Sequence, residues 1–268
     1  MLTSLLVLFA FGCLTGVTTV LFGFGGGFIT VPVVYGVLTL GADSGSDAMH
    51  VAVATSTAVM LVNSLMATVA QLRLGRVRRA YVWPLAAFVA VGAVIGSSAA
   101  TWVSGPVLRI LFAVYLLVTI VDSLLRKGFL SVADGTGPAP LGRFTSTFGG
   151  VGIGSVAAFL GVGGSVMTVP LLRRRGLPMT AATAMANPLS VPVAVAGTVV
   201  YALAAGAPAH SGRVGYVDLV SGIALLAGSL PTIAVVKRVT GRIPDRVHSI
   251  AYIALLVLVL LAMVLTGS

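Results

Sequence analysis

Two glycine-rich clusters are the parts of this sequence whose residue types and spacing could do chemistry. Residues 23–27 read Gly-Phe-Gly-Gly-Gly, and residues 161–165 read Gly-Val-Gly-Gly-Ser. Glycine allows a positive φ and lets a ligand approach the main chain closely. The apolar segment after each cluster can restart a helix, whose free N–H groups and positive dipole end attract an anion. We therefore expect each cluster to break a helix and to bind an anion without a buried lysine or arginine.

Hydroxyl side chains accompany both clusters. Thr30 and Thr168 lie just beyond the glycines, and Ser165 stands where the first cluster has its last glycine. Each hydroxyl can donate a hydrogen bond to an anion. The alternative is that the glycines only let helices pack closely, which is the role we expect for Gly92 and Gly96. At the two paired clusters we favour binding over packing.

The next apolar segment of each half adds further donors. Thr55 and Ser56 open one such segment, and Asn187 takes the comparable place in the other half. These three suit either oxyanion recognition or hydrogen bonding between helices, whereas Asn63 and Ser64 favour helix packing. The predicted substrate-binding residues are Gly23, Gly25, Gly26, Gly27, Thr30, Thr55, Ser56, Gly161, Gly163, Gly164, Ser165, Thr168 and Asn187, and the predicted kink-forming prolines are Pro32, Pro170 and Pro188.

The elements that position these residues are expected to lie in a membrane. Of 268 residues, 58% are hydrophobic and 8% are charged, whereas a soluble domain carries about a quarter charged residues. This composition excludes a water-soluble enzyme, and the high hydrophobicity excludes a disordered chain. The net charge of +10 comes from short basic clusters between apolar runs, which is typical of cytoplasmic loops rather than of nucleic-acid binding.

The apolar runs predict a set of membrane-spanning helices. A bilayer core of about 30 Å needs about 20 apolar residues per helix. The full-length spans that we predict are residues 50–72, 80–102, 107–125, 180–204, 216–236 and 247–266. Two other runs, 3–40 and 144–172, are too long for one span, and each contains a glycine cluster. We expect each of these runs to form a helical hairpin that turns at its glycines.

The two halves of the chain resemble each other in sequence. The segment 23–34, with its glycine cluster and Thr-Val-Pro, recurs at 161–172. Gly-Arg-Val at residue 75 recurs at 212, and the Arg and Tyr of 109–115 recur in 246–252. Three matches in the same order indicate a duplicated unit. We therefore divide the chain into an N-terminal repeat (1–125), a cytoplasmic linker (126–142) and a C-terminal repeat (143–268).

Charge predicts the topology of these repeats. If each hairpin returns to its own side, all Lys and Arg residues except Arg109 and Arg213 fall on one face, which the positive-inside rule makes cytoplasmic. Each repeat then crosses an odd number of times, so the repeats are inverted and both termini lie outside. The predicted fold is an all-α polytopic membrane protein with two inverted-topology repeats, each a Gly-broken hairpin plus three transmembrane helices, about eight to ten helices in all. Inverted repeats with helices broken at matching positions are typical of secondary transporters.

Acidic and histidine residues argue against other functions. All six acids are Asp, and none falls at a mid-membrane position, where a proton-relay carboxylate would be expected. We expect His50 to be a boundary residue at the start of a span. Because no metal-ligand cluster or Ser/His/Asp arrangement has a suitable setting, we expect neither an enzyme nor a cofactor. Coupling to H⁺ or Na⁺ stays open, since unwound carbonyls at the helix breaks could bind Na⁺.

The paired clusters, each followed by Thr-Val-Pro, resemble those of the TauE/SafE sulfite exporter family. Ala54-Thr55-Ser56 and the basic loop 73–79 add to the resemblance, which extends over essentially the whole chain. It implies a multi-pass permease of a bacterial or archaeal inner membrane for small anions such as sulfite or sulfonates, including sulfoacetate. The resemblance also implies transport driven by an ion gradient or by the membrane potential. It is compatible with a homodimer. Ser165 and Asn187-Pro188 depart from the first-half pattern and could alter which anion fits.

These features together predict a secondary carrier, with export favoured. An anion that leaves a negative interior gains about 2.3 kcal/mol per charge per 100 mV. The expected partners are a small anionic substrate and the lipid bilayer, with no nucleic acid. An anion channel and a non-transporting membrane assembly component are the alternatives.

Overall fold

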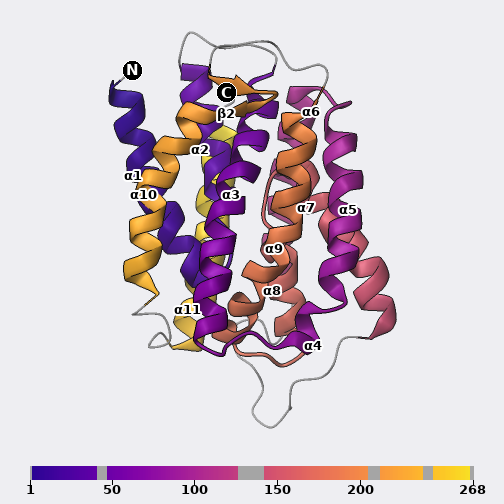
Figure 1. Ribbon diagram of the computed structural model, residues 1–268. Helices are drawn as coiled ribbons and strands as arrows, with labels where there is room; N and C mark the ends of the chain where they lie inside the picture. The colour runs from indigo at the N-terminus through magenta and orange to yellow at the C-terminus, as the bar shows by residue number, and fades with distance from the viewer. Residues whose placement is uncertain (1, 41–46, 126–141, 205–211, 238–243, 266–268) are drawn as a thin grey trace.

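The computed structural model describes residues 2–40, 47–125, 142–204, 212–237 and 244–265 (Figure 1). In the first half the helices are α1 (Leu2–Phe22), α2 (Gly27–Leu40), α3 (Ala48–Arg73), α4 (Arg79–Val82), α5 (Leu85–Ala100) and α6 (Gly105–Leu125). The second half contains a π-helical turn η1 (Thr145–Gly149), α7 (Gly150–Leu160), α8 (Ser165–Arg173), α9 (Met179–Ala202), β1 (Arg213–Val214), β2 (Val217–Asp218), α10 (Leu219–Val236) and α11 (Asp245–Leu265). The predicted linker lies outside the described residues except for Gly142.

The predicted all-α polytopic membrane fold is confirmed. Within the described ranges, seven helices are long and apolar enough to cross a membrane. Six of them match the six predicted full-length spans, and the seventh is α1. The runs 3–40 and 144–172 are each divided into two helices at their glycine clusters, as expected. Each half therefore contains a broken hairpin followed by three longer helices.

One predicted boundary was wrong. The span expected at 216–236 begins at Leu219, because the Asp218 carboxylate accepts hydrogen bonds from the N–H groups of Val220 and Ser221 and caps α10. The residues before it form a two-stranded antiparallel hairpin in which Arg213 pairs with Asp218.

The helix directions place most of the described basic residues at one end of the bundle. Figure 1 shows α1 beginning and α11 ending at the same end, with α4 at the opposite end. Arg73 ends α3, Arg173 ends α8 and Arg246 lies in the first turn of α11, all at the α4 end. We call this the basic end. Arg109, in the first turn of α6, lies at the other end, as the hairpin topology predicts.

Helices of the two halves pack across each other. The helix α1 lies beside α10 (Figure 1), and α7 packs against α5. Glycines make both contacts close: a Cβ at Gly12 would lie 2.3 Å from the Leu225 carbonyl oxygen, and one at Gly96 would lie 1.9 Å from that of Ser155. The expected packing role of Gly92 and Gly96 is therefore confirmed. The first helix of each half, α1 or α7, thus packs against a later helix of the other half, which agrees with a duplication. The inverted relation of the halves stays a prediction.

We predict that Gly96→Ala destabilises the protein by about 1–3 kcal/mol, because the added methyl group meets backbone rather than a movable side chain. For a chain of this size, the midpoint of thermal unfolding in detergent should fall by roughly 3–10 °C. The control is Gly222→Ala, since a Cβ at Gly222 meets only Thr55 and Val59, both at 3.9 Å. Equal midpoints for the two variants would contradict the packing role.

Candidate functional site

The first glycine cluster forms a turn that other residues could not adopt without strain. The N–H group of Gly23 donates to the Thr19 carbonyl oxygen at 3.1 Å and ends α1. Gly23, Gly25 and Gly26 have φ values of 74°, 62° and 89°, a region that L side chains rarely occupy. A Cβ at Gly23 would also lie 2.6 Å from the Thr183 carbonyl oxygen. The cluster therefore breaks the helix for a local conformational reason.

The second cluster breaks its helix with a different backbone. Gly161 has a φ of 68° and caps α7, as Gly23 does for α1. Gly164, however, has a φ of −56° and forms the N-cap of α8, and Gly163 is outside the positive-φ region. The two turns thus share the first left-handed glycine but not the path that follows it.

Ser56 joins the two turns. Its hydroxyl on α3 lies 2.8 Å from the carbonyl oxygens of both Gly27 and Gly161. A Cβ at Gly27 would lie 2.8 Å from the Gly161 oxygen, so the turns are in direct contact. Residues separated by more than 130 positions in sequence are therefore brought together in the buried centre of the bundle.

Three oxygen atoms converge where Gly163 lacks a side chain. A Cβ at this position would lie 2.6 Å from the Phe24 carbonyl oxygen, 2.9 Å from Ser190 Oγ and 3.1 Å from Ser165 Oγ. The Phe24 oxygen comes from the first turn, Ser165 from the second and Ser190 from α9. The space that glycine leaves open is thus lined by both turns and by two hydroxyls.

Several buried donors near the turns have no hydrogen-bond partner within the described part of the chain. They include Ser165 Oγ, Thr168 Oγ1, Asn63 Nδ2 and Thr15 Oγ1, and all four residues are fully buried. Asn63 Nδ2 would lie 2.9 Å from a Cβ at Gly26. An unsatisfied buried donor costs about 1–3 kcal/mol, so a native protein that keeps several in one place requires an explanation. A bound acceptor such as an anion would satisfy them.

Some predicted residues have other partners. Thr30 Oγ1 donates to the carbonyl oxygen of Gly26, the residue before α2. Thr55 Oγ1 accepts the Asp218 N–H at 2.9 Å and fastens the β-hairpin to α3, so the structure does not bring Thr55 to the turns. Asn187 Nδ2 donates to the Thr19 carbonyl oxygen and holds the end of α1, while its Oδ1 has no partner among the described residues.

Two residues near the turns were missing from the predicted set. Asn63 was assigned to helix packing, and its Oδ1 does accept the Ser229 hydroxyl, but its amide nitrogen faces Gly26. The Ser190 hydroxyl borders the space that Gly163 leaves open. Helical spacing could have indicated both, because Asn63 is seven residues after Ser56 and Ser190 is three residues after Asn187, on shared helix faces.

The three predicted kink-forming prolines all lie inside helices. Pro32 is in α2, Pro170 is in α8 and Pro188 is in α9. A proline has no N–H group for the carbonyl four residues earlier. For Pro170 that carbonyl belongs to Val166, and the Tyr252 hydroxyl donates to it at 3.1 Å. The broken α8 is thus held by α11 just after the turn.

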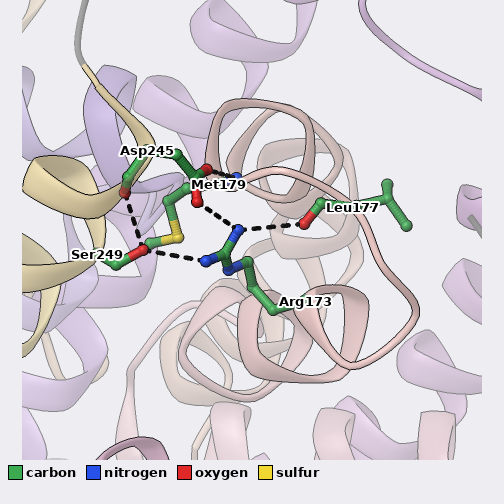
Figure 2. A network of polar contacts seen from close by, with 5 residues as sticks. All are labelled: Arg173, Leu177, Met179, Asp245 and Ser249. Atoms are coloured by element: carbon green, nitrogen blue, oxygen red, sulfur yellow. Dashed lines mark hydrogen bonds and ion pairs between the residues drawn. The ribbon is translucent and has the colours of Figure 1, made fainter. Parts of the chain in front are cut away.

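A buried ion pair fixes the other end of α8 (Figure 2). The Arg173 side chain is only 1% exposed, and its Nη1 lies 2.8 Å from Asp245 Oδ2. Arg173 Nη2 donates to Ser249 Oγ, and Asp245 Oδ1 accepts the first N–H of α9, from Met179, at 2.6 Å. The sequence placed Arg173 only on the face that carries most Lys and Arg residues and indicated no structural role for it. Because α8 has nine residues, the ion pair helps to fix the position of the second turn.

The end opposite the basic end carries its own polar contacts. His50 Nε2 lies 2.9 Å from the Val103 carbonyl oxygen, and the imidazole stacks on the Tyr216 ring. Burial raises the pKa of Tyr216, and the Asp47 carboxylate raises that pKa further. His50 is thus a boundary residue, as expected. Among the described residues, no group of three or more His, Cys, Asp or Glu side chains could hold a metal ion.

Comparison with known proteins agrees with this architecture. A family model described as sulfite exporter TauE/SafE matches residues 8–263, which include both glycine turns. The chain belongs to the TauE/SafE sulfite exporter family. No curated protein and no solved structure matches it. Membership of TauE/SafE, together with the seven apolar helices, makes this a multi-pass membrane protein of a family of anion exporters.

We predict that Arg173→Gln destabilises the protein strongly. Removing one partner of a buried ion pair costs about 3–5 kcal/mol, and we expect the lower end of this range because the Asp245 side chain is 34% exposed. The control is Arg174→Gln, because Arg174 pairs with Asp122 at the surface, where such pairs contribute about 0–1 kcal/mol. The measurement is the thermal-unfolding midpoint in detergent. An Arg174 variant as unstable as the Arg173 variant would rule out this anchoring role.

Proposed function

We propose that this TauE/SafE protein is a secondary carrier that exports small sulfur-containing anions such as sulfite or sulfonates, including sulfoacetate. The observation that carries the proposal is the direct meeting of two glycine turns beside unpaired buried donors. The family supports anion export. The identity of the anion and the role of the turns are the parts that we propose.

The donor set suits an oxyanion. Ser165 and Thr168 supply hydroxyls from the second turn and α8, and Asn63 supplies an amide next to the first turn. The N-terminal ends of α2 and α8 add positive dipole ends at the same place. None of these groups carries a full charge, so the anion is bound by several moderate interactions and can be released again. This property is needed by a carrier.

Alternating access would require the turns to separate. In the structure the turns pack against each other in the buried centre of the bundle. This supports a closed arrangement and favours a carrier over an open channel. The hairpin of α1 and α2 contacts α10 of the second half, and α7 contacts α5 of the first half. Movement of each hairpin with its partner helix would open the centre toward one side at a time.

The distribution of charge supports an orientation. We infer that the basic end faces the cytoplasm of a bacterial or archaeal cell and that both termini lie outside. An anion leaving through the protein would then move down the membrane potential.

Coupling to Na⁺ would use carbonyl oxygens at the helix breaks, and those of Gly27 and Gly161 converge on Ser56. Flux measured with and without Na⁺ and pH gradients distinguishes these modes.

We predict that Ser165→Ala and Thr168→Val weaken anion binding without lowering stability. A hydrogen bond to a charged group contributes about 1.5–3 kcal/mol, so the Kd should rise roughly 10- to 100-fold. Because both donors are unpaired without ligand, their removal should leave the basal unfolding midpoint unchanged or raised. Binding is measured as the sulfite-dependent rise in that midpoint.

The matched control for these variants is Ser97→Ala, another buried serine, whose hydroxyl donates to the Ala93 carbonyl oxygen within α5. Its sulfite response should equal that of the wild type. A normal response in Ser165→Ala and Thr168→Val would contradict the assignment of these donors.

Adjacent glycines provide a transport test. Gly163→Ala places a methyl group among the oxygens of Phe24, Ser190 and Ser165, and we expect anion flux into or out of liposomes to fall at least tenfold. Gly164→Ala should keep flux close to wild type, because its Cβ meets neighbours only at 3.6 Å or more. If the two variants transport equally well, the open space at Gly163 is not part of the site.

A further inference from the structure

A cavity of about 440 Å³ lies among α6, η1 with α7, and α8. Its body is lined by apolar side chains, among them Val118, Ile153 and Met167. Asp122 near the end of α6 and Arg174 just after α8 also line it, and they form an ion pair at the basic end. The cavity is thus lined mainly by apolar side chains, with one positive and one negative side chain at one end.

Small residues create this cavity. Gly152 has no atom within 4 Å of an added Cβ, and Gly149 meets only Thr145, at 3.6 Å. In the first half, the residues 138 positions earlier than Gly152 and Val166 are Leu14 and Phe28. The same offset relates Gly12 to Gly150 and Gly16 to Gly154, which supports the alignment along α1 and α7. The second half therefore has small side chains where the first half has large ones.

The occupant of such a cavity must be largely apolar. Water does not fill an apolar cavity readily, and an empty space of this size would forfeit packing contacts that protein interiors otherwise make. Part of the apolar lining reaches the outer surface, where Val118 is 60% exposed. In a membrane protein these side chains face hydrocarbon, so lipid chains lie beside the cavity.

We propose that the cavity binds one phospholipid of the leaflet at the basic end, with an acyl chain between α6 and α7 and a zwitterionic ethanolamine headgroup at the ion pair. The guanidinium of Arg174 binds the lipid phosphate, and the carboxylate of Asp122 accepts from the lipid ammonium group. An anionic headgroup would satisfy Arg174 but would be repelled by Asp122. The lining includes none of the proposed anion donors Ser165, Thr168 and Asn63.

The test compares lipid binding in cavity-filling and control variants. Protein purified in mild detergent is stripped of lipid, and the rise in its thermal-unfolding midpoint is measured on adding phosphatidylethanolamine or phosphatidylglycerol. Wild type should respond more to phosphatidylethanolamine. Gly152→Leu, whose side chain enters the cavity, should lose at least two thirds of that response and carry correspondingly less co-purified phospholipid by native mass spectrometry.

The control Gly142→Leu makes the same change outside the cavity lining, at a residue whose added Cβ would meet no atom of the described residues within 4 Å, so it should respond like wild type. Asp122→Asn should remove the preference for the ethanolamine headgroup. An unchanged response in Gly152→Leu, or an equal loss in Gly142→Leu, would overturn the lipid site. A wild-type preference for phosphatidylglycerol would overturn the headgroup assignment. If Gly152→Leu instead abolished anion flux while its lipid response was unchanged, the cavity would belong to the transport route and the proposal would fail.

Discussion

The structure depends on one constraint: a helix broken at membrane depth must have its exposed backbone groups covered by protein, because lipid cannot hydrogen-bond them. Here two breaks cover each other. The Ser56 hydroxyl lies within hydrogen-bonding distance of a carbonyl oxygen from each turn. The Tyr252 hydroxyl donates to the Val166 carbonyl oxygen, which has no N–H partner at Pro170. The surrounding helices are arranged so that both turns remain in the buried centre of the bundle.

Packing between the halves keeps the breaks in place. The glycine contacts of α1 with α10 and of α7 with α5 tie each hairpin to the opposite half. The Arg173–Asp245 pair then fixes the far end of α8 (Figure 2). Among the described residues, several buried hydroxyls have no hydrogen-bond partner, and those of Ser165 and Thr168 belong to the second turn and to α8 just after it. We infer that a buried donor without a partner marks a binding residue where it also lies beside the two turns.

The membrane fold and the two helix breaks followed from the sequence because they depend on composition and on glycine itself. Side-chain roles did not follow, since neighbours in sequence point about 100° apart on a helix and sequence does not show which face is inside. Thr55 binds a loop amide while Ser56 binds the turns. Likewise, Arg173 is buried and Arg174 lies at the surface. The cavity beside α7 depends on three helices packing around Gly149 and Gly152, which no local pattern indicates.

We infer that the two turns together bind the transported anion. A structure of the protein with sulfite or a small sulfonate bound tests it most directly. We expect the anion between the turns, within hydrogen-bonding distance of Ser165 Oγ and Thr168 Oγ1. An anion bound only elsewhere, with both turns still in direct contact and their donors still unpaired, would contradict it.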